Sequence, residues 1–282
     1  MINHYVPLNK LEALEILDKH DCYIMAGGTD LMVQKHRSNQ ILPNFDKDIL
    51  YISNLKELNY VRLIDNEIHI GATTKYVELL DSDIIPQMLK DVIKDIASPN
   101  IRNMATLAGN IANASPAGDS LVALYILDAK LKLESLKETR IIPIRDFILG
   151  VRKIDRNKNE MITEIIIPNI NLKYRWVKVG SRKAETISKL SFLGAFEEEN
   201  GKIIDFRIAF GSVNVTVVRS EEIEKKYLNK TIAEMKHMAN AITLDYQDLI
   251  KPIDDQRSNK NYRHKVAINL LRDFVTHLDD YE

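Results

Sequence analysis

The spacing of apolar residues divides the first half of the chain into short segments of alternating kind. Apolar residues that recur every three or four positions predict helices, whereas two-residue alternation and short apolar runs predict strands. The two patterns follow each other up to about residue 168, so this half is expected to be mixed α and β. The expected helices lie at 9–20, with Asn9 as the N-cap, and at 31–36, 75–80, 84–97 and 121–127. The expected strands lie at 22–25, 48–52, 130–134, 139–144 and 164–167, and a hairpin is expected at 61–71 with Asp65, Asn66 and Glu67 at its tip.

The pattern changes after a polar stretch at 169–173, which we interpret as a linker. Three antiparallel strands are expected there, with Asn200 and Gly201 turning the last pair, and helical patterns fill the remainder. The fold class is therefore predicted to be α+β, with a C-terminal domain that combines a three-stranded sheet and a helical bundle. The strands are expected at 174–179, 191–196 and 203–210, the helices at 220–227, 232–244 and 261–278, and the domains at 1–170 (subdomains about 1–55 and 56–170) and 171–282.

The segment 98–120 fits neither pattern and is expected to be a long loop. It reads SPNIRNMATLAGNIANASPAGDS, and its small side chains would let the backbone approach a ligand closely. Its Asn, Ser and Thr side chains supply short donors and acceptors. Asp119 and Ser120 stand where the N-cap of the next helix is expected, and the unpaired amides of that first turn favour an anionic or polar ligand group. The sequence therefore predicts a binding loop.

A second candidate is AGGTDL at 26–31, between a strand and the start of a helix. Two consecutive glycines allow positive φ and leave the backbone N–H groups open to a pyrophosphate. Taken alone, the motif also fits an ordinary turn. Its occurrence together with the segment 98–120 favours the phosphate site.

Charge and composition exclude several classes of protein. The chain has 39 basic and 40 acidic residues, so it carries no electrostatic footprint for nucleic acid. Its single cysteine, Cys22, excludes disulfides, thiolate zinc sites and iron–sulfur clusters held by this chain alone. The histidines show no HxxH or HExxH spacing, so no metal site is expected. No membrane span or signal peptide is evident, and a cytoplasmic location is expected.

Four segments together resemble the flavin-binding subunit of molybdenum hydroxylases, the family of the xanthine dehydrogenase FAD subunit and the carbon monoxide dehydrogenase medium subunit. They are the two loops, WVKVGSRKAETISKLSF at 176–192 and GKIIDFRIAFGSV at 201–213. The resemblance covers essentially the whole chain in order. It implies a p-cresol methylhydroxylase-type FAD-binding fold of two α/β subdomains, with FAD extended between them, and a CO dehydrogenase flavoprotein-like C-terminal domain.

The resemblance also implies roles for single residues. Lys178 matches the family's lysine near the isoalloxazine ring, where an ammonium would stabilise the negative charge of reduced flavin; it is the candidate catalytic residue, with an ordinary surface lysine as the alternative. Ala108 departs from the GGN of many relatives, and its methyl group could narrow the approach to the phosphates. The implied FAD-binding residues are Tyr23, Ala26, Gly27, Gly28, Thr29, Asp30 and Leu31 around the pyrophosphate, Thr106, Gly109 and Asn110 at the phosphate and ribityl site, Ser115 and Asp119 further along the cofactor, the Ile162 backbone near the flavin or adenine, and Lys178.

The function implied by the resemblance is electron transfer within a xanthine dehydrogenase-like complex, with a role in purine metabolism. A molybdopterin-binding large subunit would hydroxylate a purine-like or other heteroaromatic substrate, and a small subunit with 2Fe–2S clusters would pass the electrons to FAD on this chain. NAD is the expected acceptor, and a dimer of heterotrimers is the expected assembly. Two alternatives stay open: a self-contained FAD oxidoreductase, such as the enolpyruvoyl reductase of cell-wall synthesis, and a non-catalytic scaffold subunit.

Overall fold

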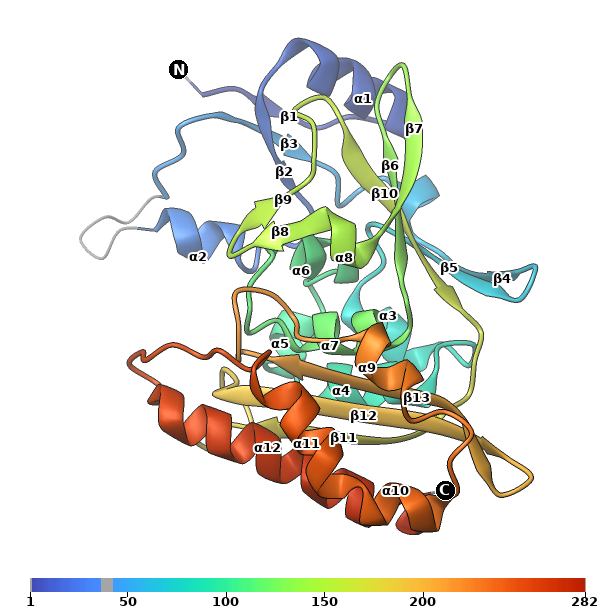
Figure 1. Cartoon of the computed structure of the whole chain (residues 1–282). Coiled ribbons are helices and arrows are strands. Elements are labelled where there is room, and N and C mark those ends of the chain that lie inside the picture. Colours follow the sequence, from blue (N-terminus) through green and yellow to red (C-terminus); the bar gives the residue numbers. More distant parts are fainter. Residues whose placement is uncertain (1, 37–42, 282) are drawn as a thin grey trace. The chain divides into compact units, whose positions relative to one another are not determined.

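The computed structural model describes residues 2–36 and 43–281, which fall into two compact units (Figure 1). Neither unit is one continuous stretch of chain, because α4 (Gln87–Lys94) and α7 (Asp119–Ile126) group with the C-terminal part. The units are Met1–Ile85, Ala97–Ser115 and Asp128–Asn169 for the first, and Pro86–Ile96, Pro116–Leu127 and Ile170–Glu282 for the second.

A small parallel sheet in the first unit carries the glycine motif at the end of one strand. Its strand order is β1 (His4–Tyr5), β3 (Asp48–Tyr51) and β2 (Cys22–Met25). Helix α1 (Lys10–Lys19) is capped by Asn9, as expected, because the Asn9 side chain accepts a hydrogen bond from the Glu12 amide. Helix α1 buries Leu14 and Leu17 in one core with Cys22 and Leu50.

A five-stranded antiparallel sheet forms the larger part of the first unit. The predicted hairpin at 61–71 is confirmed, and Asp65 and Asn66 form its turn with positive φ (47° and 63°), while Glu67 is already the first residue of the second strand. One face of the sheet is buried through Ile68, Ile70 and Ile165, each 0% exposed. The order is β4 (Val61–Ile64), β5 (Glu67–Gly71), β10 (Met161–Pro168), β6 (Lys130–Glu134) and β7 (Thr139–Pro143). The smaller elements are α2 (Leu31–Lys35), η1 (Lys56–Leu58), α3 (Tyr76–Asp81), α8 (Ile144–Phe147), β8 (Ile148–Gly150) and β9 (Lys153–Ile154).

The expectation of a long loop at 98–120 is wrong. The segment forms two short helices, α5 (Pro99–Arg102) and α6 (Leu107–Asn113), before α7 begins. Ser98 and Thr106 cap these helices by accepting hydrogen bonds from the Ile101 and Gly109 amides at 3.4 and 3.0 Å. The buried side chains of α6 then hold it in the core. The difference arises because small polar residues such as Ser98 and Thr106 cap helices as readily as they form loops.

The expected N-cap of α7 is also wrong by one or two positions. Gly118 is the N-cap and makes no side-chain capping bond, while Asp119 and Ser120 are the first two residues of the helix. The carboxylate of Asp119 therefore does not cap the helix, and it contacts Lys178 and Ser188 instead.

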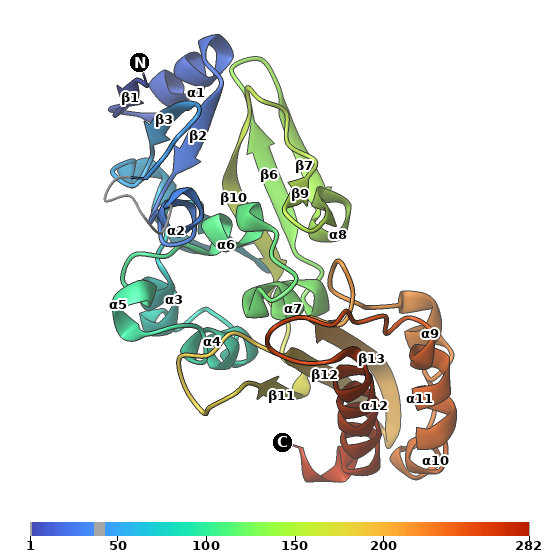
Figure 2. The same cartoon turned by 90° about the vertical axis from the view of Figure 1, so that its left-hand side faces the viewer.

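The second unit is a three-layered arrangement around an antiparallel sheet (Figures 1 and 2). The three predicted strands are confirmed as β11 (Lys173–Val179), β12 (Leu190–Glu199) and β13 (Lys202–Gly211), and Asn200 and Gly201 turn the last pair with positive φ. Helices α4 and α7 cover one face of the sheet and the C-terminal helices cover the other. These helices are α9 (Glu221–Lys225), α10 (Ile232–His237), α11 (Ala239–Gln247), α12 (Lys260–Thr276) and η2 (Leu278–Asp280), so the single helix expected at 232–244 is in fact two.

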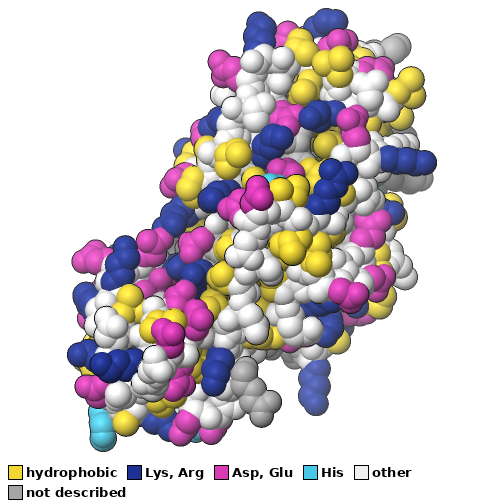
Figure 3. Space-filling model, turned by 90° about the vertical axis from the view of Figure 1, so that its right-hand side faces the viewer, with side chains coloured by type: hydrophobic (Ala, Val, Ile, Leu, Met, Phe, Trp, Pro, Cys, Tyr) yellow, Lys and Arg dark blue, Asp and Glu magenta, His cyan; other side chains and the backbone are white. Residues whose placement is uncertain are grey.

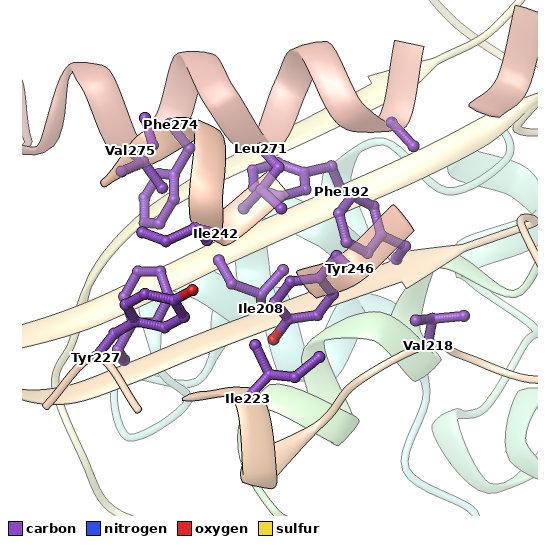
Figure 4. Packing of buried hydrophobic residues seen from close by; sticks show 14 of the residues in the cluster. Phe192, Ile208, Val218, Ile223, Tyr227, Ile242, Tyr246, Leu271, Phe274 and Val275 are labelled. Atoms are coloured by element: carbon purple, nitrogen blue, oxygen red, sulfur yellow. The ribbon is translucent and has the colours of Figure 1, made fainter. Parts of the chain in front are cut away.

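The core of the second unit is aromatic (Figure 4). Phe274 of α12 points toward the sheet and lies 5.8 Å from Phe192, measured between ring centroids. A Cβ atom on Gly194 of β12 would lie only 2.6 Å from the Phe274 ring. The glycine in the middle of this strand is therefore the space into which the phenylalanine packs.

Two arginines fix the C-terminal end of α7, whose residues are all buried. Arg207 donates to the Ile126 carbonyl at 2.6 Å, and Arg219 donates to the Tyr125 carbonyl. Arg219 also pairs at 3.1 Å with Glu224. Cations at this end satisfy free carbonyls and oppose the negative end of the helix dipole, so α7 is held in a defined position from its C-terminus.

Membrane-spanning helices, metal-ligating clusters and surface charge were each searched for in the described residues. In the part of the chain that the structure describes, no helix is long and apolar enough to cross a membrane, and no three metal-ligating side chains gather into a site. Acidic and basic side chains are interspersed over the face in Figure 3. That face shows no expanse of one sign of charge.

Candidate functional site

The loop of the glycine motif meets the short loop between α5 and α6 at Gly27. A Cβ atom at this position would lie 1.9 Å from the carbonyl oxygen of Met104 and 3.1 Å from the Cα atom of Ala105. Real Cβ contacts are never this short, and the obstacle is backbone, so any side chain at Gly27 would push the loops apart. Gly27 was expected to leave space for a ligand, but its missing side chain leaves space for the backbone of Met104.

Gly28 turns the backbone so that a run of amides is left without partners. Its φ of +69° lies in the left-handed region, and Asp30 follows in the right-handed region at φ −95° and ψ −45°. The backbone N–H groups from Gly27 to Leu31 donate to no other residue that the structure describes. Successive N–H groups in such a turn form a concave anion site. The geometry suits a phosphate or pyrophosphate.

Helix α6 begins directly after the residues that contact Gly27, with Thr106 as its N-cap. Thr106 is 4% exposed and caps the helix, while Gly109 is exposed and Asn110 is half-buried. A Cβ atom on Gly109 would lie 3.0 Å from the Thr106 Oγ1 atom, so a larger residue would disturb the cap. Ala108 is 6% exposed, which places its methyl group in the interior of the unit.

Side-chain bonds join the glycine motif to its surroundings. Gln34 of α2 donates to Asn113 of α6 at 2.7 Å. The hydroxyl of Tyr23 donates to Asp46 at 2.7 Å, and Lys35 lies 2.7 Å from the same carboxylate. Hydrogen bonds to the Asp46 carboxylate lower its pKa to about 2, and the bond from Lys35 has a larger effect than the bond from Tyr23. The Tyr23 side chain is therefore engaged with Asp46.

Lys178 and Asp119 form a buried ion pair in the second unit. The Lys178 Nζ atom lies 2.8 Å from the Asp119 Oδ2 atom, and the two side chains are 8% and 5% exposed. Lys178 also donates to the Asp95 carbonyl at 2.6 Å, and Ser188 donates to the Asp119 Oδ1 atom at 2.6 Å. Burial raises the pKa of the Asp119 carboxyl, and the ammonium of Lys178 opposes that change. Lys178 is not an ordinary exposed lysine.

The predicted site residues thus fall into two groups. Those of the glycine motif and of 106–115 lie in the first unit, where the contact at Gly27 brings the two loops together, and Ile162 lies there on β10, against which α6 packs. Ile162 is 6% exposed and adjoins a register shift between β10 and β6. Asp119 and Lys178 lie in the second unit, in contact with each other.

Comparisons with known proteins identify the family. The family model described as the FAD binding domain in molybdopterin dehydrogenase matches residues 1–170, and the model of the CO dehydrogenase flavoprotein C-terminal domain matches residues 175–278. The chain is an FAD-binding subunit of the molybdenum hydroxylase family.

Individual relatives agree with this assignment. This chain is 30% identical over 261 residues to the glyceraldehyde dehydrogenase medium chain of Sulfolobus acidocaldarius, and the match covers 91% of this chain and 90% of the relative. It is 28% identical over 262 residues to the xanthine dehydrogenase FAD-binding subunit of Escherichia coli O157:H7, covering 89% and 87%. A solved carbon monoxide dehydrogenase structure from Hydrogenophaga pseudoflava superposes with a TM-score of 0.87 at 24% identity, covering 96% and 95% of the two chains. The expected fold class is confirmed.

Three contributors to the FAD-binding subunit's site were missed in the sequence. The Met104 carbonyl, the Asp95 carbonyl and the Ser188 hydroxyl each contact a predicted site residue. Two of them are backbone atoms, which every residue has, so the sequence holds no signal for them. Ser188 lies within the segment 176–192, but its contact with Asp119 depends on how α7 packs.

Proposed function

We propose that this FAD-binding subunit accepts electrons from the 2Fe–2S clusters of a partner subunit and passes them through FAD to an acceptor such as NAD. The observation that carries the proposal is the run of amides from Gly27 to Leu31 beside the contact between Gly27 and Met104. Amides without partners in such a turn favour an anion, which supports the proposal that this motif binds the pyrophosphate of a dinucleotide.

The partners are proposed from the names of the relatives and from the composition of this chain. Relatives are called the medium chain or FAD-binding subunit of dehydrogenases, so further subunits are proposed here: a large one with molybdopterin and a small one with the clusters. Cys22 is 3% exposed and packs in the core of the first unit. A 2Fe–2S cluster needs four ligands, so it must come from another chain. A dimer of heterotrimers is the proposed assembly.

Each predicted residue has a proposed task. The amides of the motif, from Ala26 to Leu31, hold the pyrophosphate, with Thr106, Gly109 and Asn110 on its other side. Ser115 and the backbone of Ile162 contact the cofactor further along, and Tyr23 supports the first loop through Asp46. FAD itself supplies the ability to accept and release electrons one or two at a time.

Lys178 is proposed to face the isoalloxazine ring. A charged ammonium that is shielded from water acts on a nearby developing charge more strongly than an exposed one, because the surrounding dielectric is low. The 8% exposure of the Lys178 side chain meets that condition. The residue would favour the reduced, negatively charged flavin and so favour acceptance of electrons.

The first experiment is to purify the chain, record its visible spectrum and identify any released cofactor by chromatography. A flavin spectrum with FAD as the released species supports the proposal, and Gly28→Val should abolish it while Gly150→Ala should not. A folded but colourless chain that takes up no added FAD, alone or co-expressed with neighbouring subunits, would instead support the scaffold alternative.

A second experiment tests the partners and the acceptor. The native complex should contain molybdenum and iron–sulfur subunits, and anaerobic NADH should bleach the flavin if NAD is the acceptor. Recovery of the native protein without such subunits would contradict the proposal. Turnover of NADH by the isolated chain with a second small substrate would favour the self-contained oxidoreductase.

A further inference from the structure

Four separate segments of the second unit meet at the ion pair of Lys178 and Asp119. Lys178 extends from β11, Asp119 from the first turn of α7, the Asp95 carbonyl from the end of α4, and Ser188 from the residues before β12. Ser191 is paired with Lys178 across β11 and β12, and its buried hydroxyl makes no hydrogen bond among the described residues. The charges are thus enclosed from several sides.

Stability alone does not explain this arrangement. Burying an ion pair costs desolvation energy that its mutual attraction often fails to recover, and apolar side chains of similar size often stabilise a protein as well or better. The helix N-terminus does favour the negative charge of Asp119. The side chain of Lys178 nevertheless remains costly in this environment, which points to a use for its charge.

The ammonium also has a donor to spare. A lysine ammonium carries three N–H groups, and the described residues take up two of them, through Asp119 and the Asp95 carbonyl. Each oxygen of the Asp119 carboxylate has one partner: Oδ2 contacts the Lys178 ammonium, and Oδ1 accepts a hydrogen bond from Ser188. The Lys178 ammonium therefore keeps one N–H that no described residue takes up.

We propose that Asp119 is a positioning residue that acts on FAD through Lys178, keeping the ammonium charged and oriented with its third N–H available to an acceptor atom of the flavin. This inference rests on the proposed function, because it requires FAD beside Lys178. It replaces the expectation that Asp119 itself binds the cofactor.

The remaining charged groups around Lys178 already have partners. The Asp95 carboxylate accepts from the Trp176 Nε1 atom at 2.8 Å, and Asp91 of α4 accepts from the Tyr174 hydroxyl at 2.6 Å. Near β12, Lys189 lies over the Tyr262 ring, with its Nζ atom 5.7 Å from the centroid. Asp119 is thus the carboxylate paired with Lys178 among the residues that the structure describes.

Removing the charge of Asp119 should change the protonation of Lys178. Burial disfavours the charged form of an ammonium that has no counter-ion, because the group is cut off from water. In Asp119→Asn, the reduction potential of bound FAD should therefore show an added step in the neutral to alkaline range. Below the step the unneutralised ammonium favours reduced flavin, and above it that effect is lost.

The test is a double-mutant cycle with FAD affinity and the pH dependence of the reduction potential as readouts. The variants are Asp119→Asn, Lys178→Met and the two combined. Glu224→Gln is the matched control, because the Arg219–Glu224 pair is equally buried, at 9% and 6% side-chain exposure, in the same unit. Ser188→Ala removes only the hydrogen bond to Asp119 and serves as a milder variant should Asp119→Asn fold poorly.

The expected result is that Asp119→Asn weakens FAD binding about tenfold or more, as for loss of a hydrogen bond to a charged group, and adds the step in potential. Both effects should disappear when Lys178→Met is already present, Ser188→Ala should give the same changes to a smaller extent, and Glu224→Gln should give neither. Equal weakening in both backgrounds would show that Asp119 touches FAD directly and would overturn the inference. So would an unchanged affinity and potential. Absence of FAD binding by the unaltered chain would instead count against the proposed function.

Discussion

A side chain on Gly27 would collide with the carbonyl oxygen of Met104, because a Cβ atom there would lie 1.9 Å from that oxygen. The two residues belong to loops far apart in the sequence, and the absent side chain is what lets the loops meet. The amides from Gly27 to Leu31, which lack partners among the described residues, are arranged directly at this contact. A single glycine therefore links the packing of the first unit to its proposed anion site.

Gly27→Ala should therefore damage both stability and FAD binding. Overpacking against backbone costs about 1–3 kcal/mol, and separation of the loops should remove most of the bound flavin. The measurements are urea unfolding and FAD content. Gly150→Ala is the matched control, since its Cβ atom would lie 4.0 Å from the nearest neighbour, the Lys153 Cβ, and it should stay within about 0.5 kcal/mol of the unaltered protein. Wild-type stability and FAD content in Gly27→Ala would refute the proposed role of the contact.

Substitutions of Gly28 should rank by their tolerance of positive φ. The position has φ +69°, and the left-handed conformation costs an ordinary residue about 1–2 kcal/mol, whereas Asn tolerates it better. FAD affinity should fall in the order Gly28→Asn, Gly28→Ala, Gly28→Val, with the β-branched side chain worst. Titration with FAD monitored by flavin fluorescence gives the three dissociation constants. Equal affinities for all three would mean that backbone conformation at Gly28 does not shape the site.

Gly194→Ala should destabilise the second unit without touching the proposed anion site. The new Cβ atom would lie 2.6 Å from the Phe274 ring, which corresponds to overpacking of about 1–3 kcal/mol. The destabilisation should shrink in combination with Phe274→Leu, because the smaller side chain leaves room. Thermal unfolding of the single and double variants checks this, and a strictly additive pair would contradict the packing argument.

Acid should weaken the anchor of α12 at Asp255. Partial burial opposes ionisation of this carboxyl, but Arg263 at 2.6 Å and the amides of Arg257 and Ser258 prevail and lower its pKa to about 2. Because the folded pKa lies below the unfolded value of about 3.9, the stabilisation is present above pH 4 and is lost as the pH falls toward 2. It amounts to about 1–2 kcal/mol after allowance for solvent screening.

The check is to compare the unfolding free energy of Asp255→Asn with that of the unaltered chain across this pH range. The gap should be widest near pH 6 and should narrow toward pH 2, because protonation removes the same charge. Asp248→Asn, which removes an exposed carboxylate, controls for overall charge. A gap that stays constant with pH would show that the Arg263 pair contributes nothing through ionisation.

Local pattern was enough to predict most regular elements. The strand at Cys22–Met25, the N-cap at Asn9 and the Asn200–Gly201 turn are confirmed, because periodicity, capping and positive φ are properties of neighbouring residues. The same rules failed at α6, where Thr106 looks like a loop residue until its cap is seen. A residue such as Thr106 caps a helix only where the residues after it form a helix that buries one face, and local pattern does not show whether they do.

The sequence by itself determined the residue types of both loops, the lack of cysteines for a cluster and, through resemblance, the family. Only the tertiary structure decided that Gly27 makes room for Met104 and that Asp119 meets Lys178. The pair forms because α7, although it lies between segments of the first unit in the chain, packs on the sheet of the second. Such contacts join residues distant in sequence through packing and burial, and no local pattern of side chains encodes them.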